Sequence, residues 1–298
     1  MLQSWRQSTK SQYFCYLPMW LSFIKNVSDP SVYDGIEFLN SLFAKRFSYQ
    51  QICMARSAVS VLLQSDGRPF GKHPAVQRFM KGVFELRPVF PSYQFTWCLK
   101  TLFDYFRKLP HQKDLPFPLL GKKLAILIAL LAGGQRCQTI HAINALHIRV
   151  LHDRCIIPIF RTLKQTRPGA HLKPLEFKVY TRESKLCVVD NLKEYLRKTM
   201  PIRCYPQLFL AMQKPHKPVS VDTISRWCRH MMGAGGIDVT KYSTHSCRAA
   251  APSFAKHKGV RLQTIVDSAG WSSQKTFAKF YSKEISGESV IGESLLSP

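Results

Sequence analysis

Apolar positions recur at helical spacing through residues 1–110, with polar and basic side chains between them. Serine and proline stand where helices would begin, as N-caps or in a first turn. The pattern predicts five helices: Ser8–Asn26, one capped by Ser31, one capped by Ser48, one with Pro74 in its first turn, and Phe95–Lys108. We therefore expect residues 1–110 to form a small all-α bundle with basic faces.

The pattern changes after residue 110, where three prolines within residues 110–118 predict a linker over 111–118. The following segment is apolar on all sides, which indicates a buried helix that stops at Gly133-Gly134. Further on, the sequence predicts two strands and two more helices, the last capped by Ser220 or Asp222: Cys155–Phe160, Leu175–Tyr180, Asp190–Lys198 and Val221–Met232. The fold class expected is mainly α with a small β-hairpin in a second domain, residues 119–298.

The charge narrows the choice of partner. Lys and Arg number 43 against 18 acidic residues, a formal net charge of +25. An excess spread along the whole chain favours a folded surface that follows a phosphate backbone, although a merely soluble basic protein is the plain alternative. No basic amphipathic anchor or lipidation motif supports a membrane partner. Candidate DNA-binding residues are Arg56, Lys72, Arg78, Lys81, Lys217, Arg226 and Arg229.

The cysteines and histidines argue against a disulfide-stabilised protein and against a metal-binding protein. Nine cysteines, an odd number without a C-x-x-C pair, predict reduced intracellular thiols rather than a disulfide framework. No H-E-x-x-H or zinc-finger spacing occurs, so we expect no metal and no cofactor. The N-terminus lacks a signal-peptide pattern. The longest apolar run, Leu124–Ala132, is too short to cross a bilayer.

Four residues near the end of the chain suggest chemistry on a phosphodiester. His245 and Arg248 stand three apart, a spacing that places both on one face of a helix start, and A-G-W-S with Trp271 and then Tyr281 follow. A guanidinium binds two non-bridging oxygens through its planar fork. An imidazole moves protons, and a phenol is a nucleophile. Each residue alone is more often an ordinary surface or core residue.

The order H-x-x-R, A-G-W-S and a late tyrosine resembles the tyrosine recombinase (phage integrase) family. The resemblance points upstream to Arg136, in L-L-A-G-G-Q-R-C-Q-T-I, and to Lys164, in the connection between the two predicted strands. Lys173 on the same hairpin stays an alternative to Lys164. The chain departs from the family pattern at Thr139, where an acid is common, and at Ala249, where a second histidine is common.

The resemblance implies a helical core-binding domain and a catalytic domain that together clamp double-stranded DNA. Tyr281 would attack the phosphodiester and form a 3′-phosphotyrosyl link, while Arg136 and Arg248 hold the non-bridging oxygens. Lys164 would protonate the leaving 5′-oxygen. His245 would assist proton movement, and Trp271 would pack and donate through its indole N–H.

Finer motifs, such as F-G-K-H-P-A-V-Q-R-F and K-P-H-K-P-V-S-V-D-T-I-S-R-W, resemble the recombinases of eukaryotic mobile elements of the DIRS or Crypton sort. This resemblance implies DNA integration by a transposable element, a homo-oligomer (tetramer) on DNA and a nuclear location. Two other functions stay open: a DNA-binding descendant that no longer cuts, and DNA relaxation like that of a type IB topoisomerase.

Overall fold

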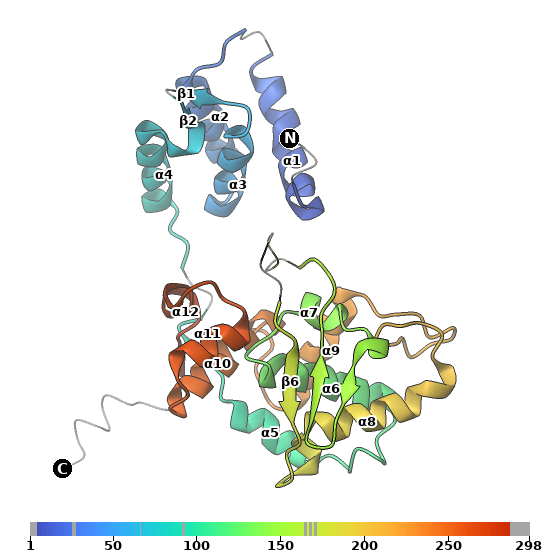
Figure 1. Cartoon of the computed structure of the whole chain (residues 1–298). Coiled ribbons are helices and arrows are strands. Elements are labelled where there is room, and N and C mark those ends of the chain that lie inside the picture. Colours follow the sequence, from blue (N-terminus) through green and yellow to red (C-terminus); the bar gives the residue numbers. More distant parts are fainter. Residues whose placement is uncertain are drawn as a thin grey trace, which may run out of the picture. The chain divides into compact units, whose positions relative to one another are not determined.

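The structure, a computed structural model, describes residues 5–25, 28–65, 67–90, 93–163, 166, 169 and 172–286. The chain folds into two compact units, Met1–Pro91 and Ser92–Pro298. Figure 1 shows the elements of each unit.

The first unit is a helical bundle whose helices begin where the sequence predicts. It contains α1 (Gln7–Phe23), α2 (Val32–Ala44), α3 (Tyr49–Val59), the antiparallel pair β1 (Gln64–Ser65) and β2 (Arg68–Pro69), the 3-10 turn η2 (Phe70–Lys72) and α4 (Pro74–Leu86). Ser31 and Ser48 each cap a helix with a full capping box, and Pro74 occupies the first turn of α4. These bonds satisfy backbone donors that a helix start leaves unpaired, so the local sequence fixes where the helices begin.

The second unit begins with β3 (Phe95–Thr96), α5 (Leu99–Lys108), α6 (Phe117–Leu131), α7 (Cys137–His141) and η3 (Ala145–His147). An antiparallel sheet follows, in the order β4 (Arg149–Val150), β5 (Arg154–Ile157) and β6 (Leu175–Lys178). Next come η4 (Ser184–Leu186), α8 (Val188–Thr199), η5 (Met200–Ile202) and α9 (Val221–Ala234). The unit ends with η6 (Thr244–Ser246), α10 (Cys247–His257), α11 (Leu262–Ala269), α12 (Gln274–Phe280) and β7 (Glu284–Ile285).

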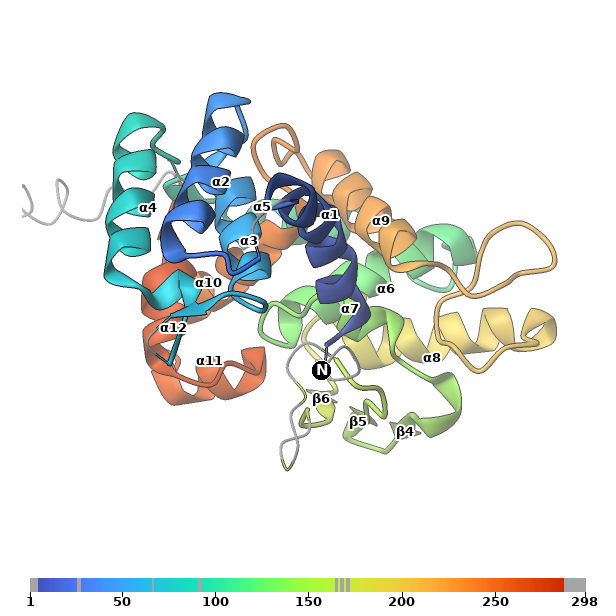
Figure 2. The same ribbon diagram turned by 90° about the horizontal axis from the view of Figure 1, so that it is seen from above.

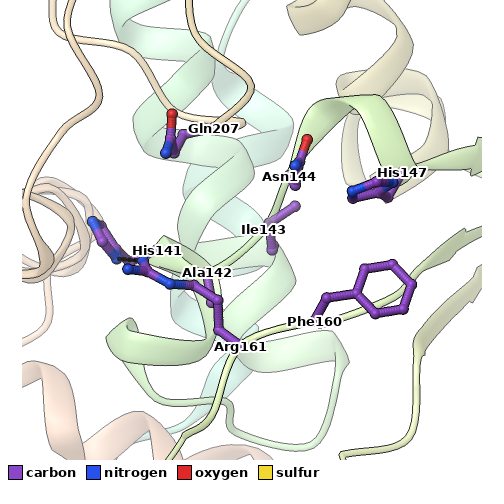
Figure 3. A pocket seen from close by; sticks show the side chains of 8 residues that line it. All are labelled: His141, Ala142, Ile143, Asn144, His147, Phe160, Arg161 and Gln207. Atoms are coloured by element: carbon purple, nitrogen blue, oxygen red, sulfur yellow. Dashed lines mark hydrogen bonds between the residues drawn. The ribbon is translucent and has the colours of Figure 1, made fainter.

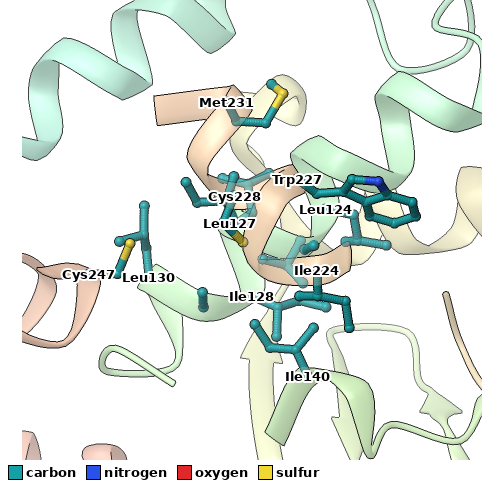
Figure 4. Packing of buried hydrophobic residues seen from close by; sticks show 14 of the residues in the cluster. Leu124, Leu127, Ile128, Leu130, Ile140, Ile224, Trp227, Cys228, Met231 and Cys247 are labelled. Atoms are coloured by element: carbon teal, nitrogen blue, oxygen red, sulfur yellow. The ribbon is translucent and has the colours of Figure 1, made fainter. Parts of the chain in front are cut away.

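Helix α6 is the centre of the second unit. In Figures 1 and 2 it lies between α8 and α9, and the sheet β4–β6 lies on the α8 side. Leu124, Leu127 and Ile128 are fully buried against side chains of α9 such as Ile224 and Cys228, as Figure 4 shows. A helix that is apolar on every side needs neighbours on every side, and this one has them.

The fold class predicted from the sequence is confirmed: the chain is mainly helical with small sheets. The structure differs from the prediction where strands pair. The expected helix Phe95–Lys108 begins only at Leu99, because Phe95–Thr96 pairs in parallel with β7. The sheet has an additional strand, β4, of two residues, which is too short to show a period.

The boundary between the two compact units lies earlier than the predicted boundary at residue 110. Leu102 and Phe106 of α5 are fully buried in the core of the second unit, and Leu115, inside the predicted 111–118 linker, is 1% exposed there. Apolar burial of this kind ties a segment to the unit that covers it. In the folded chain, α5 and Leu115 therefore pack with the second unit, and the domain bounds 1–110 and 119–298 stay a prediction.

In the described part of the chain, no helix is both long and apolar enough to cross a membrane.

Candidate active site

The first arginine follows a glycine turn that presses against helix α10. Gly133 and Gly134 follow α6 with φ of 81° and 79°, a left-handed conformation that favours glycine. A Cβ on Gly134 would lie 2.9 Å from the Cα of Arg248 and 3.0 Å from the carbonyl oxygen of Cys247. The turn can approach α10 this closely only because it lacks side chains. Arg136 then stands at the N-cap of α7, near enough to Arg248 for its charge to act on that guanidinium.

Arg248 is the second arginine, and its position is fixed by backbone carbonyls. Its side chain is only 1% exposed, on α10. Nη1 donates to the carbonyl oxygen of Gly134 at 2.7 Å, and Nη2 donates to that of Ala269, at the end of α11, at 3.4 Å. Nε has no hydrogen-bond partner among the described residues. Three segments far apart in the sequence thus meet at one guanidinium.

Burial, together with the nearby charge of Arg136, lowers the pKa of Arg248 to about 10. A side-chain hydrogen bond with Tyr281 opposes this change. Two guanidiniums close together repel each other, so the pair favours an anion between or beside them. At neutral pH both remain cations.

Tyr281 lies where α12 ends, stacked on Trp271. The two ring centroids are 4.7 Å apart with an interplanar angle of 17°. Cζ of Arg248 lies 5.4 Å from the Tyr281 ring and 5.3 Å from the Trp271 ring. The indole Nε1 of Trp271 is buried without a partner in the described part of the chain. Stacking and cation–π contacts therefore hold the phenol over the arginine.

The backbone around Tyr281 is tied to two other segments. Oγ of Ser253, on α10, donates to the carbonyl oxygen of Tyr281 at 2.9 Å and accepts from the backbone N–H of Lys283 at 3.0 Å. The next residues form β7, which pairs in parallel with β3. Nζ of Lys283 donates to the carbonyl oxygen of Tyr93 at 3.1 Å. The backbone at Tyr281 and just after it is thus fixed by hydrogen bonds to α10 and to the segment around β3.

His245 lies at the edge of the same group, in η6 just before α10, so the H-x-x-R pair spans a 3-10 turn and a helix start. Its ring centroid is 6.2 Å from that of Tyr281. The imidazole is exposed. The structure therefore brings together five of the six predicted catalytic residues: Arg136, His245, Arg248, Trp271 and Tyr281.

Lys164, the sixth, lies outside the described residues. Lys173, the alternative, is exposed, and its Nζ forms an ion pair at 3.4 Å with Asp267 of α11. That carboxylate is two residues from Ala269, whose carbonyl oxygen contacts Arg248. The choice between the two lysines stays open.

Gln135 is a positioning residue that sequence reasoning missed. Its side chain is buried, and Nε2 donates to the carbonyl oxygens of Ala132 and Ser268, at 2.9 and 2.7 Å. The amide thereby ties the turn that carries Arg136 to the end of α11. The available signal was a polar residue between an apolar helix and the arginine, but its partner 133 residues away leaves no mark on the local pattern.

The predicted DNA-binding residues fall into two groups. In the first unit, Arg56 and Lys81 line one open groove of about 440 Å³, while Lys72 and Arg78 are exposed on η2 and α4. In the second unit, the remaining three are exposed, on α9 and just before it: Lys217, Arg226 and Arg229. Their roles stay predictions.

In the described ranges, no group of three or more His, Cys, Asp or Glu side chains is arranged to hold a metal ion. The cations at this site are side chains, so the arrangement has the charge needed for chemistry on a phosphodiester.

Comparison with known proteins identifies the fold that carries this site. No family model and no curated protein matches the sequence. Solved structures do. The integrase of the Tn1549 transposon, in complex with transposon right end DNA, matches with a TM-score of 0.63 at 12% identity, over 98% of this chain and 93% of that one.

Two further matches agree. The XerH site-specific recombinase, in a pre-cleavage complex with difH substrate, has a TM-score of 0.60 at 13% identity, covering 97% of this chain and 78% of that one. A lambda integrase tetramer bound to a Holliday junction has a TM-score of 0.53 at 15% identity, covering 94% and 73%. At these identities the likeness establishes the fold, and the chain has the fold of the tyrosine recombinases.

Proposed function

We propose that this protein cleaves and rejoins DNA strands through a 3′-phosphotyrosyl intermediate. One observation carries the proposal: Tyr281 lies over the guanidinium of Arg248, the charge of Arg136 acts on that guanidinium, and donors of this group are unpaired. Nη1 of Arg136, Nε of Arg248 and Nε1 of Trp271 are buried without partners among the described residues. Buried donors are nearly always paired, and the non-bridging oxygens of a phosphodiester would accept from all three.

The reaction balances without a cofactor. The Tyr281 oxygen attacks phosphorus, a new P–O bond forms, and the bond to the 5′-oxygen breaks. The phenolic proton passes to His245 or to water, and the 5′-oxygen takes a proton from a lysine. Arg136 and Arg248 stabilise the negative charge that grows on the non-bridging oxygens. Attack by a 5′-hydroxyl on the phosphotyrosine reverses the steps and rejoins a strand.

The finer assignment is a recombinase of a eukaryotic mobile element, acting in the nucleus on double-stranded DNA. The DIRS- or Crypton-like motifs support it. A tetramer on DNA is the expected assembly, and the lambda integrase tetramer on a Holliday junction is a precedent in this fold. The two alternatives predict different products. A binder forms no adduct, and a topoisomerase relaxes a plasmid that carries a single site.

A covalent trap tests the proposal. Duplexes that the protein binds would first be selected from a random pool, and then nicked so that the cleaved end diffuses away. Incubation followed by denaturant should leave a protein–DNA adduct on a gel. If duplexes bound at nanomolar concentration yield no adduct at any nick position, the protein is a binder and the proposed chemistry is wrong.

The general acid is assigned by a second substrate. A 5′-bridging sulfur leaves as a thiolate with a pKa near 8.5 and needs no proton. Removing the acid should slow cleavage of ordinary DNA by about 10²–10⁴-fold and leave the sulfur substrate nearly unaffected. We expect this rescue for Lys164→Ala. Rescue of Lys173→Ala instead would assign the acid to Lys173.

A further inference from the structure

A second concave site lies one short helix away from Arg136. It encloses about 230 Å³ and is shown in Figure 3. We call it the side pocket; its polar and aromatic walls are His141, Asn144, His147, Phe160, Arg161 and Gln207. The volume is below the roughly 300–1,000 Å³ of ordinary small-molecule sites. It therefore suits one flat ring system.

One wall of the side pocket is aromatic. The Phe160 ring is 74% exposed, just beyond the end of β5. Its centroid is 5.0 Å from that of His147, at an interplanar angle of 84°. In Figure 3 both rings lie on the same side of the pocket. An exposed phenyl ring supported from its edge is a stacking surface, and stacking one base on an aromatic side chain contributes about 1–3 kcal/mol.

Another wall carries two carboxamides on neighbouring segments. Asn144 and Gln207 form an isolated antiparallel β-bridge. Oδ1 of Asn144 accepts from the backbone N–H of Leu146 at 2.8 Å, which leaves its amide nitrogen as a donor. Oε1 of Gln207 is buried and unpartnered among the described residues. Asn144 therefore offers a hydrogen-bond donor to the edge of a nucleobase, and Gln207 lines the same pocket.

A third part of the pocket wall is basic. Nη1 of Arg161 lies 3.4 Å from Nδ1 of His141. Burial lowers the pKa of His141, and the Arg161 charge lowers it further. At neutral pH the imidazole is therefore largely neutral, while Arg161 is a cation. The side pocket combines a stacking surface, a hydrogen-bonding edge and one positive charge, which are the groups that recognise a nucleotide.

The position of the side pocket ties it to the candidate active site. Helix α7 starts directly after Arg136 and ends at His141. At about 1.5 Å per residue this run covers about 7.5 Å. The rise of a DNA strand is about 3.4 Å per nucleotide. A strand whose phosphate contacts Arg136 would thus bring a base within about three nucleotides to the pocket.

We infer that the side pocket takes one unstacked base of the bound DNA, within about three nucleotides of the cleaved phosphate. The inference rests on the proposed function, because it needs DNA at Arg136. It adds a site that reads or holds a single base outside the helical stack. The pocket's walls come from the end of α7, Asn144 and η3, the segment after β5 and the segment around Gln207, so all of them belong to the second unit.

Removing a base's pairing partner tests the inference, because unpairing costs a few kcal/mol that the protein otherwise supplies. Selected duplexes would carry an abasic site opposite each base in turn. Affinity would be measured by fluorescence anisotropy at one salt concentration. We expect one position near the cleaved phosphate to bind at least about 10-fold tighter than the intact duplex. Deleting the base at that position as well should remove the gain.

Variants separate the pocket from general binding. Phe160→Ala should abolish the gain, whereas Phe160→Trp should keep the gain. Tyr180→Ala is the matched control, since Tyr180 is also an exposed aromatic residue but follows β6 at the other end of the sheet. Thermal melts check that each variant is folded.

The outcomes are distinguishable from failure of the proposed function. If the Tyr281 adduct forms but no position gains affinity, or if Phe160→Ala keeps the gain, the side-pocket inference is wrong and the proposed function stands. If one position gains affinity through Phe160 but no adduct forms, the pocket is supported and the cleavage chemistry is wrong. If the protein binds no duplex at all, both fail.

Discussion

Arg248 and Arg226 carry the same guanidinium in opposite surroundings. Arg248 is 1% exposed, held by the carbonyl oxygens of Gly134 and Ala269, and keeps an unpaired Nε. Arg226 is exposed on α9, where its Nη2 donates to Oγ1 of Thr223 at 3.0 Å. A cation whose position is fixed before DNA binds can stabilise charge that appears only in a transition state. A solvated cation adjusts to any phosphate, and so contributes to affinity.

The net charge of +25 does not tell which basic residues merely attract DNA and which form part of a site, whereas the surroundings of each residue do. Many basic residues can attract DNA, but few are built into a site. Burial, fixed carbonyl partners and an unpaired donor distinguish the few. Substitutions at the two kinds of position should therefore change different measured quantities.

Replacing the nucleophile should give the largest effect. Tyr281→Phe keeps the stack on Trp271 but removes the phenolic oxygen that forms the covalent link in the proposed reaction. We expect no detectable adduct in the covalent trap, with duplex affinity close to that of the wild type. Tyr180→Phe is the matched control and should give a normal yield. An adduct of normal yield in Tyr281→Phe would assign the nucleophile elsewhere.

Replacing the fixed arginine should slow chemistry more than binding. Arg248→Lys keeps a charge but loses the planar fork and the Nε donor, so cleavage should fall by about 10²–10³-fold. The measurement is the rate of adduct formation at saturating DNA. Arg226→Lys should stay within about twofold of the wild-type rate. Equal losses in the two variants would mean that burial does not distinguish these arginines.

Local signals explain which parts of the fold were predictable. Ser31, Ser48 and Ser220 cap helices through bonds to a residue three positions on, so a short stretch of sequence carries the whole signal. Phe95–Thr96 pairs with Glu284–Ile285, so two strands of only two residues each meet although most of the second unit's sequence lies between them. No periodicity can reveal such strands.

The candidate site was predictable only in part, for the same reason. The motifs around Arg136, Arg248 and Tyr281 are local runs, and the family resemblance supplied their order. Gln135 and Ser253 act through bonds to distant carbonyls, which no local pattern encodes. The side pocket has no local signal either, because Phe160, at the end of a predicted strand, and Gln207 lie on segments far apart in the sequence.

The glycine turn should contribute stability that the exposed cations do not. Gly134→Ala introduces a Cβ at 2.9 Å from the Cα of Arg248 at a φ of 79°. We expect the free energy of unfolding of the second unit to fall by about 3 kcal/mol, from the left-handed conformation and from overpacking. Gly259→Ala, also left-handed but with nothing within 4 Å, should lose only about 1–2 kcal/mol. Chemical denaturation measures both, and equal losses would show that the close approach is not stabilising.

Removing one exposed cation should give the smallest effect, and it should appear in the salt dependence. Each phosphate contact releases counterions, so log affinity against log salt has a slope of about −0.9 per contact. Arg226→Ala should make that slope less steep by about 0.9 and weaken binding equally on unrelated duplexes, while the cleavage rate at saturating DNA stays unchanged.

Lys193→Ala is the control: Lys193 is exposed on α8, and α6 separates that helix from α9 in Figure 2. If Lys193→Ala changes the slope as much as Arg226→Ala does, α9 is no special phosphate-binding face. If neither changes it, the cations that meet DNA lie elsewhere, and the groove lined by Arg56 and Lys81 in the first unit becomes the next place to test.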